Sequence, residues 1–224
     1  MRNKIITLTL IVFIGYFSLV SEGGTKKIAC VGDSITEGFG ISVDKRKEFC
    51  WPSVLQKILG NKYKIENFGV CGRTLIRDVP SSWVKTNCPK RLAEFKPDII
   101  IMMLGTNDSQ KKVWKYKDNF EEDLKKYIAD FRKINWSVKI YLSLPPPSFS
   151  GKKLRTGDNY SASLIRDEII PILRKVAKEE KIPVIDTFSK FIKKAEYFAD
   201  GLHPNIQGAE AIAKFIASEL KLKK

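Results

Sequence analysis

Short apolar runs alternate with segments of helical spacing along most of this chain. The clearest run is Asp98–Leu104 (D-I-I-I-M-M-L), an uninterrupted apolar stretch typical of a strand covered on both faces. Four shorter runs predict further strands, at Lys27–Val31, Tyr63–Phe68, Val138–Leu142 and Pro183–Asp186.

The segments between these runs have the pattern of helices with one buried face. From Asp118, which is placed to cap the first turn, to Ile134, apolar residues recur at helical spacing. Another helix is predicted over Ser163–Glu180, with a kink or break at Pro171, because proline lacks the N–H that a helix interior uses. Helices are also predicted at Pro52–Leu59 and Asn205–Leu220.

Strands that alternate with helices form a parallel sheet with helices on both faces. We therefore predict an α/β fold, a three-layer α/β/α sandwich around a five-stranded parallel sheet. Ligands bind such sheets beyond the C-terminal ends of the strands. Polar or glycine-rich segments follow four of the five predicted strands, and they contain Ser34, Gly72, Asn107, Asp200 and His203.

The N-terminus differs from the rest of the chain. Two basic residues precede an apolar stretch over residues 5–20, and small residues follow it near Gly23. This is the layout of a secretory signal peptide. We predict a signal peptide over residues 1–23, one domain over residues 25–224, and a secreted or periplasmic protein without stable membrane insertion. An uncleaved membrane anchor is the alternative, since the stretch is only slightly shorter than a membrane span.

The formal net charge is +15 at pH 7, from 40 basic and 25 acidic residues. A basic excess is one mark of nucleic-acid binding. Here the basic residues are spread along the chain rather than clustered, and predicted export argues against a nuclear or cytosolic role. We predict no nucleic-acid partner. An anionic polysaccharide or cell surface is the alternative target for this charge.

Four cysteines have two predicted roles. Cys30 and Cys71 fall where strands end, which favours small core residues. Cys50 and Cys88 lie in irregular segments and could pair in an oxidising compartment. Such a disulfide would contribute about 3–4 kcal/mol on the chain-entropy model. The sequence has no C-x-x-C motif or cysteine–histidine cluster, and we predict no metal and no cofactor.

The single histidine of the chain, His203, stands three residues after Asp200 in D-G-L-H-P-N. Histidine is the usual proton carrier near neutral pH. Ser34 lies in G-D-S-I-T-E-G, directly after the first predicted strand. A serine, a histidine and a carboxylate are the parts of a serine hydrolase. For Ser34 alone, capping of the following helix is the alternative role.

Two more segments offer hydrogen-bond donors. Gly72 lies in G-V-C-G-R-T, where backbone N–H groups are available, and Asn107 in G-T-N-D offers a side-chain amide. The oxyanion formed from an ester needs such donors, each worth roughly 10²–10³ in rate. Simple turns are the alternative, because glycine supplies positive φ and asparagine bonds nearby backbone. We interpret Asp33 and Asp108 as local supports of their loops.

These four blocks together resemble those of the GDSL, or SGNH, hydrolases in order and spacing, over residues 27–220. The first block reads G-D-S-I where the family name has G-D-S-L. The resemblance implies the flavodoxin-like SGNH hydrolase fold and a serine esterase that works through an acyl-enzyme.

The resemblance also assigns roles to the residues of the four blocks. Ser34 would be the nucleophile, and His203 the general base and then the general acid. Asp200 would orient the imidazole ring. The oxyanion hole would consist of the backbone N–H groups of Ser34 and Gly72 with the side chain of Asn107.

Longer tracts, such as N-F-G-V-C-G-R-T and I-M-M-L-G-T-N-D-S, are similar to a secreted branch described as sialate O-acetylesterase-like or carbohydrate acetylesterase-like. That similarity implies removal of acetyl groups from sialic acid or a polysaccharide. Arg73 is predicted to contact the sugar, with a surface salt bridge as the alternative. Trp114 and Trp83 could stack on sugar faces, with core packing as the alternative.

Two other functions stay open. A lysophospholipase or acyl thioesterase of the same fold would use the same residues on acyl chains. A non-catalytic secreted glycan-binding protein would keep the scaffold without the chemistry.

Overall fold

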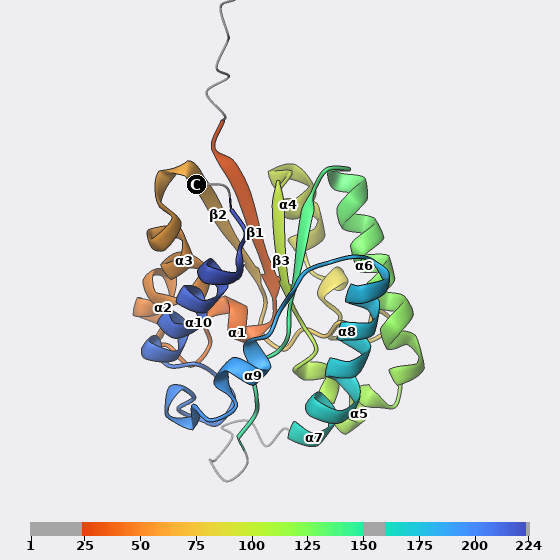
Figure 1. Cartoon of the computed structure of the whole chain (residues 1–224). Helices are drawn as coiled ribbons and strands as arrows, with labels where there is room; N and C mark the ends of the chain where they lie inside the picture. Colours follow the sequence, from red (N-terminus) through yellow and green to blue (C-terminus); the bar gives the residue numbers. More distant parts are fainter. Residues whose placement is uncertain (1–23, 150–159, 223–224) are drawn as a thin grey trace, which may run out of the picture.

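A computed structural model of the protein describes residues 24–149 and 160–222. Its centre is a sheet of five parallel strands in the order β2-β1-β3-β4-β5 (Figure 1). The strands are β1 (Lys26–Gly32), β2 (Tyr63–Gly69), β3 (Ile99–Met103), β4 (Lys139–Ser143) and β5 (Val184–Ile185). The predicted five-stranded parallel sheet is therefore confirmed. The signal peptide predicted over residues 1–23 lies outside the described residues.

Helices cover both faces of this sheet, as predicted (Figure 1). The α-helices are α1 (Ser34–Glu37), α2 (Val43–Phe49), α3 (Trp51–Leu59), α4 (Cys88–Phe95), α5 (Lys111–Trp114), α6 (Phe120–Ile134), α7 (Ala162–Leu164), α8 (Ile170–Glu179), α9 (Thr187–Phe191) and α10 (Ile206–Glu219). Single turns of 3₁₀-helix lie at Gly60–Lys62, Trp83–Lys85, Asn107–Ser109, Lys117–Asn119 and Ala195–Tyr197.

Alternate residues of each central strand enter two separate apolar cores. In β3, Ile100 and Met102 pack toward α4, α6 and α8, whereas Ile99, Ile101 and Met103 pack toward α3 and α10. This follows from the period of two in a strand, whose successive side chains point to opposite faces. All five β3 residues are buried, which explains their uninterrupted apolar sequence.

Some local predictions were wrong in detail. Asp118 does not cap α6, because it lies within the preceding 3₁₀ turn and Asn119 takes the capping position without a side-chain bond. The predicted helix over 163–180 is divided, as proline there suggested. A π-helical turn at Ile165–Ile169 leads into α8, whose first turn holds Pro171. Helices α2 and α4 were not predicted.

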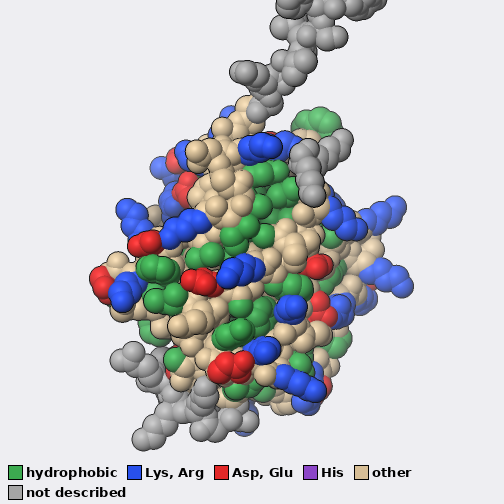
Figure 2. Space-filling view, turned by 60° about the vertical axis from the view of Figure 1, so that its left-hand side comes forward, with side chains coloured by type: hydrophobic (Ala, Val, Ile, Leu, Met, Phe, Trp, Pro, Cys, Tyr) green, Lys and Arg blue, Asp and Glu red, His purple; other side chains and the backbone are tan. Residues whose placement is uncertain are grey.

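The face that carries α2, α3 and α10 has lysine and arginine side chains spread over it, with acidic side chains among them (Figure 2). This distribution agrees with the scattered basic residues of the sequence. Within the described parts of the chain, every helix is too short or too polar to cross a lipid bilayer.

The parallel strands all end at the edge of the sheet where α1 and α9 lie (Figure 1). Gly32 pairs with Gly69 and Met103 at this edge, so the loops after β1, β2 and β3 start side by side. The candidate catalytic residues are carried by these loops and by the segment that precedes α10.

Candidate active site

Ser34, His203 and Asp200 form one hydrogen-bonded line. The Ser34 hydroxyl oxygen lies 3.0 Å from His203 Nε2, and His203 Nδ1 lies 2.7 Å from Asp200 Oδ2. Both the serine and the histidine are buried, at 3% and 4% exposed. A hydroxyl, an imidazole and a carboxylate in this order can pass a proton from the serine to the ring.

Asp200 is fixed by more than the imidazole. Its Oδ1 atom accepts the backbone N–H groups of Leu202 (2.9 Å) and His203 (2.7 Å). Burial alone would raise the pKa of Asp200, but the hydrogen bonds from the His203 ring and these two N–H groups outweigh it and lower the pKa to about 2. The group therefore stays a carboxylate at neutral pH, as a partner for an imidazolium must.

The turn that carries Ser34 follows from the G-D-S sequence. Asp33 caps α1 by accepting the Ile35 N–H at 2.9 Å, so Ser34 becomes the first residue of the helix. The Ser34 N–H then lies at a helix N-terminus, where it has no intrahelical acceptor. Gly32 is required because a Cβ there would lie 2.1 Å from Thr36 Oγ1.

The loop after β2 brings Gly72 to the same edge. Gly72 has φ +74°, a left-handed conformation that favours glycine. Glu37 Oε2, from the last residue of α1, accepts the Cys71 N–H and so ties this loop to the serine helix. Arg73 N donates to Val70 O at 3.3 Å and closes the turn.

Asn107 joins the serine turn to the Gly72 loop. Its side-chain nitrogen Nδ2 donates to Arg73 O at 2.9 Å and to Asp33 Oδ2 at 3.2 Å. The other end of the amide, Oδ1, accepts the hydroxyl of Tyr160 at 3.1 Å. The structure thus brings together all five residues that the sequence predicted for catalysis and the oxyanion hole.

Asp33 and Asp108 are two buried carboxyl groups behind the site. Burial raises the pKa of Asp33 to about 7, against the opposing effect of the Ile35 N–H. Burial likewise raises the pKa of Asp108 to about 6, although its two oxygens accept the N–H groups of Ile76 and Leu75 at 2.9 Å each. Both support loops, as interpreted from the sequence, but Asp108 supports the loop after β2 rather than its own.

Sequence reasoning missed three side chains at the site. Phe39 packs on the imidazole of His203 with ring centroids 4.7 Å apart. Glu37 holds the Gly72 loop, and Tyr160 contacts Asn107. Glu37 lies within the glycine-rich G-D-S-I-T-E-G motif, three residues after the serine, and this position was the available signal. Phe39 and Tyr160 lie outside the motifs.

The tryptophans predicted to stack on a sugar belong to the core. Trp114 is 6% exposed, packs on Phe120 and donates its Nε1–H to Glu168 at 3.0 Å. Trp83 is 1% exposed and donates its Nε1–H to Phe68 O at 2.9 Å. Core packing therefore replaces the predicted sugar contact for both. Arg73 is half-buried beside Gly72, and its sugar contact stays a prediction.

The predicted disulfide is wrong. Cys50 and Cys88 are both buried free thiols. Cys88 is the first residue of α4 and lies in the core with residues of α6, whereas Cys50 contacts Ser53 and Asn67 beside α3, on the opposite face of the sheet. Cys30 is buried in the core as predicted, but Cys71 is exposed, because β2 has already ended at Gly69 and the loop turns outward.

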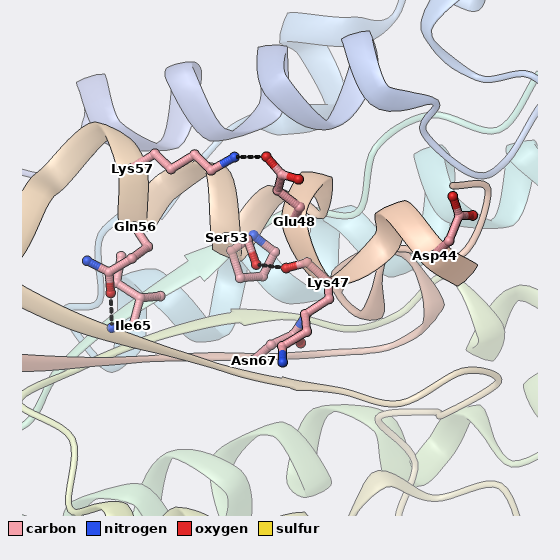
Figure 3. Close-up of a pocket in the computed structure, with 9 residues that line it drawn as sticks. Asp44, Lys47, Glu48, Ser53, Gln56, Lys57, Ile65 and Asn67 are labelled. Atoms are coloured by element: carbon pink, nitrogen blue, oxygen red, sulfur yellow. Dashed lines mark hydrogen bonds and ion pairs between the residues drawn. The ribbon is translucent and has the colours of Figure 1, made fainter. Parts of the chain in front are cut away.

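The described residues contain no group of three or more histidine, cysteine or acidic side chains that could hold a metal ion. A separate groove of about 510 Å³ lies between α2, α3 and β2 (Figure 3). Two of its charged residues, Lys57 and Glu48, form an ion pair at 2.9 Å. None of the residues that line this groove belongs to the Ser34–His203–Asp200 line.

Known proteins resemble the chain over nearly the whole of this domain. An acetylxylan esterase of Xylanibacter ruminicola is 35% identical over 213 residues, which are 87% of this chain and 43% of that protein. The chain thus spans less than half the length of that relative. A protein of Escherichia coli named thioesterase 1/protease 1/lysophospholipase L1 is 24% identical over 193 residues, 85% of this chain and 81% of that protein.

Solved structures share the fold. A carbohydrate acetylesterase family member from Sinorhizobium meliloti superposes with a TM-score of 0.67 at 22% identity, over 88% of this chain and all of that one. At the level of families, the model described as GDSL-like Lipase/Acylhydrolase matches residues 30–211, which include the serine block and the histidine block. The chain therefore belongs to the GDSL-like lipase/acylhydrolase family, as its four sequence blocks indicated.

Proposed function

We propose that the protein is a serine esterase that removes acetyl groups from carbohydrate hydroxyls. The observation that carries this proposal is the line from Ser34 through His203 to Asp200, with distances of 3.0 Å and 2.7 Å. The similarity to an acetylxylan esterase supports acetyl esters of a sugar polymer as the substrate.

In the acylation step, Ser34 Oγ attacks the carbonyl carbon of the ester, and its proton passes to His203 Nε2. The Asp200 carboxylate stabilises the imidazolium that results. When the tetrahedral intermediate collapses, the bond between the carbonyl carbon and the sugar oxygen breaks. His203 gives its proton to that oxygen, and the acetyl group stays on Ser34.

Deacylation repeats these moves with water. His203 takes a proton from water, whose oxygen attacks the acetyl carbonyl carbon. Collapse of the second tetrahedral intermediate breaks the bond to Ser34 Oγ and releases acetate. The proton on His203 returns to the serine, so the enzyme ends in its starting state.

The oxyanion of each intermediate would take hydrogen bonds from the N–H groups of Ser34 and Gly72 and from Asn107 Nδ2. The surroundings of Gly72 support this role, since a Cβ built there has no atom within 4 Å apart from its chain neighbours. Of the two bonds that Asn107 Nδ2 makes, the one to Asp33 is the longer, at 3.2 Å, and is the one that the oxyanion would replace.

The preference of the enzyme for the acyl group of the ester is tested with p-nitrophenyl acetate and p-nitrophenyl palmitate. We expect fast turnover of the acetate, and a loss of several orders of magnitude in Ser34→Ala. The control is Ser137→Ala, at an exposed serine at the far edge of the sheet, which should keep full activity. A preference for palmitate would instead favour a lysophospholipase or thioesterase, which the similarity to the Escherichia coli protein supports. Equal rates for wild type and Ser34→Ala would exclude the serine mechanism.

The preference of the enzyme for the sugar that carries the acetyl group is tested by acetate release from acetylated xylan and from O-acetylated sialic acid. We propose a polysaccharide or sialic acid substrate, and Arg73, beside Gly72, as a contact to the sugar. Arg73→Ala should then raise KM for the glycan more than for p-nitrophenyl acetate, which has no sugar. An equal effect on both substrates would exclude the sugar contact.

We also propose that residues 1–23 are a signal peptide and that the protein acts outside the cytoplasm. The basic start, the apolar stretch over residues 5–20 and the small residues near Gly23 support this. Intact mass measurement of the protein produced in bacteria should show a chain that starts near Gly24. An intact N-terminus in the membrane fraction would favour the anchor instead.

A further inference from the structure

We propose that Tyr160 is a positioning residue that holds the Asn107 amide in the geometry of the oxyanion hole. The proposal rests on the function proposed above. Its basis is the hydrogen bond of 3.1 Å from the Tyr160 hydroxyl to Asn107 Oδ1, on the side of the amide opposite to the donor nitrogen.

Before reaction, three contacts fix the plane of this amide. Nδ2 donates to Arg73 O and Asp33 Oδ2, and Oδ1 accepts from Tyr160. When the oxyanion replaces Asp33 as acceptor, only the Arg73 carbonyl and the Tyr160 hydroxyl remain. Because one bond lies at each end of the amide, loss of the tyrosine hydroxyl would leave the group free to turn about its remaining bond at the moment when its direction matters.

The hydroxyl also makes Asn107 a better donor. A hydrogen bond to an amide oxygen polarises the amide and strengthens the bonds that its N–H groups donate. The effect is small toward the neutral carbonyl oxygen of bound substrate. It grows as negative charge develops on the substrate oxygen, so it favours the transition state over bound substrate.

The start of α7 places Tyr160 for this role. The next residue, Ser161, caps α7 by accepting the Leu164 N–H at 3.2 Å. Its own N–H donates to Ser109 Oγ at 3.3 Å, two residues after Asn107. Ser109 in turn donates to Thr106 O at 2.8 Å. The backbone on both sides of the tyrosine–asparagine contact is thus joined by a second bond, which sets the distance between the two side chains.

A double-mutant cycle on p-nitrophenyl acetate tests the proposal. Tyr160→Phe keeps the ring and removes only the hydroxyl. We expect kcat to fall about three- to tenfold, in line with the loss of one neutral hydrogen bond, while KM stays within about twofold. Asn107→Ala alone should lower kcat by roughly 10²–10³. In the Asn107→Ala background, Tyr160→Phe should cause no further loss, because its target is gone.

The control is Tyr63→Phe, at the opposite edge of the sheet, which should leave kcat unchanged. Tyr160→Leu provides a second variant without the hydroxyl. Its loss of kcat must likewise occur only when the Asn107 side chain is present. The melting temperature of each variant reports whether the domain is folded.

The outcomes separate this proposal from the proposed function. An unchanged kcat in Tyr160→Phe would overturn the positioning role while leaving the esterase intact. A loss of equal size with and without the Asn107 side chain would also overturn it, since the tyrosine would then act on the substrate or on the fold. An unchanged kcat in Asn107→Ala would instead remove the oxyanion hole proposed above.

Discussion

The Nε2 atom of His203 lies 3.0 Å from the hydroxyl oxygen of Ser34, although 169 positions separate the two residues in the chain. Ser34 follows β1, an inner strand between β2 and β3, and His203 follows β5, the last strand at one side of the sheet. The contact forms because the loops after all the parallel strands lie at the same end of the sheet, and because the segment before α10 turns back over that end. Phe39 and Gly40, in the loop after α1, pack against the histidine and hold it there.

Asp200→Asn should abolish most of the activity without unfolding the protein. The asparagine oxygen can still accept the Leu202 and His203 N–H groups, so its NH₂ group faces His203 Nδ1. The ring then carries its proton on Nε2 and cannot accept the serine proton. We expect kcat to fall by roughly 10²–10⁴, with the melting temperature nearly unchanged. Asp167→Asn, at an exposed site, is the control, and kcat within threefold of wild type in Asp200→Asn would contradict the assignment.

Gly40→Ala should lower activity, and Gly60→Ala should not. Both glycines have positive φ, +99° and +68°, so both substitutions add backbone strain, on the order of 1–3 kcal/mol. A Cβ added at Gly40 would lie 2.8 Å from His203 Cβ, in the active site. A Cβ added at Gly60 would have no atom within 4 Å. Backbone strain should lower the melting temperature of both variants, whereas displacement of His203 should lower kcat only in Gly40→Ala. Equal kcat values would mean that the Gly40 contact does not position the histidine.

The buried carboxyl groups of Asp33 and Asp108 predict that stability falls as pH rises. Their pKa values are about 7 and about 6 in the folded state, against 3.8 when unperturbed. The folded state therefore binds their protons more tightly than the unfolded state does. This stabilisation is complete below about pH 4 and is lost as pH rises through 6 to 7.

From these pKa values, we expect the two groups together to lower the free energy of unfolding by roughly 6 kcal/mol between pH 4 and pH 7.5. Urea unfolding at several pH values measures how steeply the free energy of unfolding changes with pH. Asp33→Asn should reduce this pH dependence, because the group no longer titrates, while Asp78→Asn at an exposed site should not. A wild-type stability that rises steadily over this range would contradict the raised pKa values.

The cysteines should behave as four free thiols. Cys30, Cys50 and Cys88 are buried and Cys71 is exposed. A thiol reagent should label one cysteine quickly in the folded protein and all four after denaturation. A reductant should leave the melting temperature unchanged, since no disulfide joins Cys50 to Cys88. A melting temperature that falls by several degrees on reduction would show that a disulfide had formed.

The order of the elements and the four catalytic blocks were determined by the sequence. Ile99–Met103 is apolar at every position because both faces of β3 are covered, and such a run is visible without a structure. The parallel arrangement then implies that Ser34, Gly72 and Asn107 meet at one edge. Local chemistry was also readable, as in the Asn205 side chain that caps α10 by accepting the Gly208 N–H.

The tertiary structure decided what the irregular segments face. Trp114 and Cys88 read as exposed or loop residues in the sequence, but the turns before them bring both into the core. Cys71 turns outward although it closely follows β2. The contact of Tyr160 with Asn107 joins positions 53 residues apart. Periodicity reports which face of a helix or strand is buried; in a loop no such period exists, and the packing of the whole chain sets the direction of each side chain.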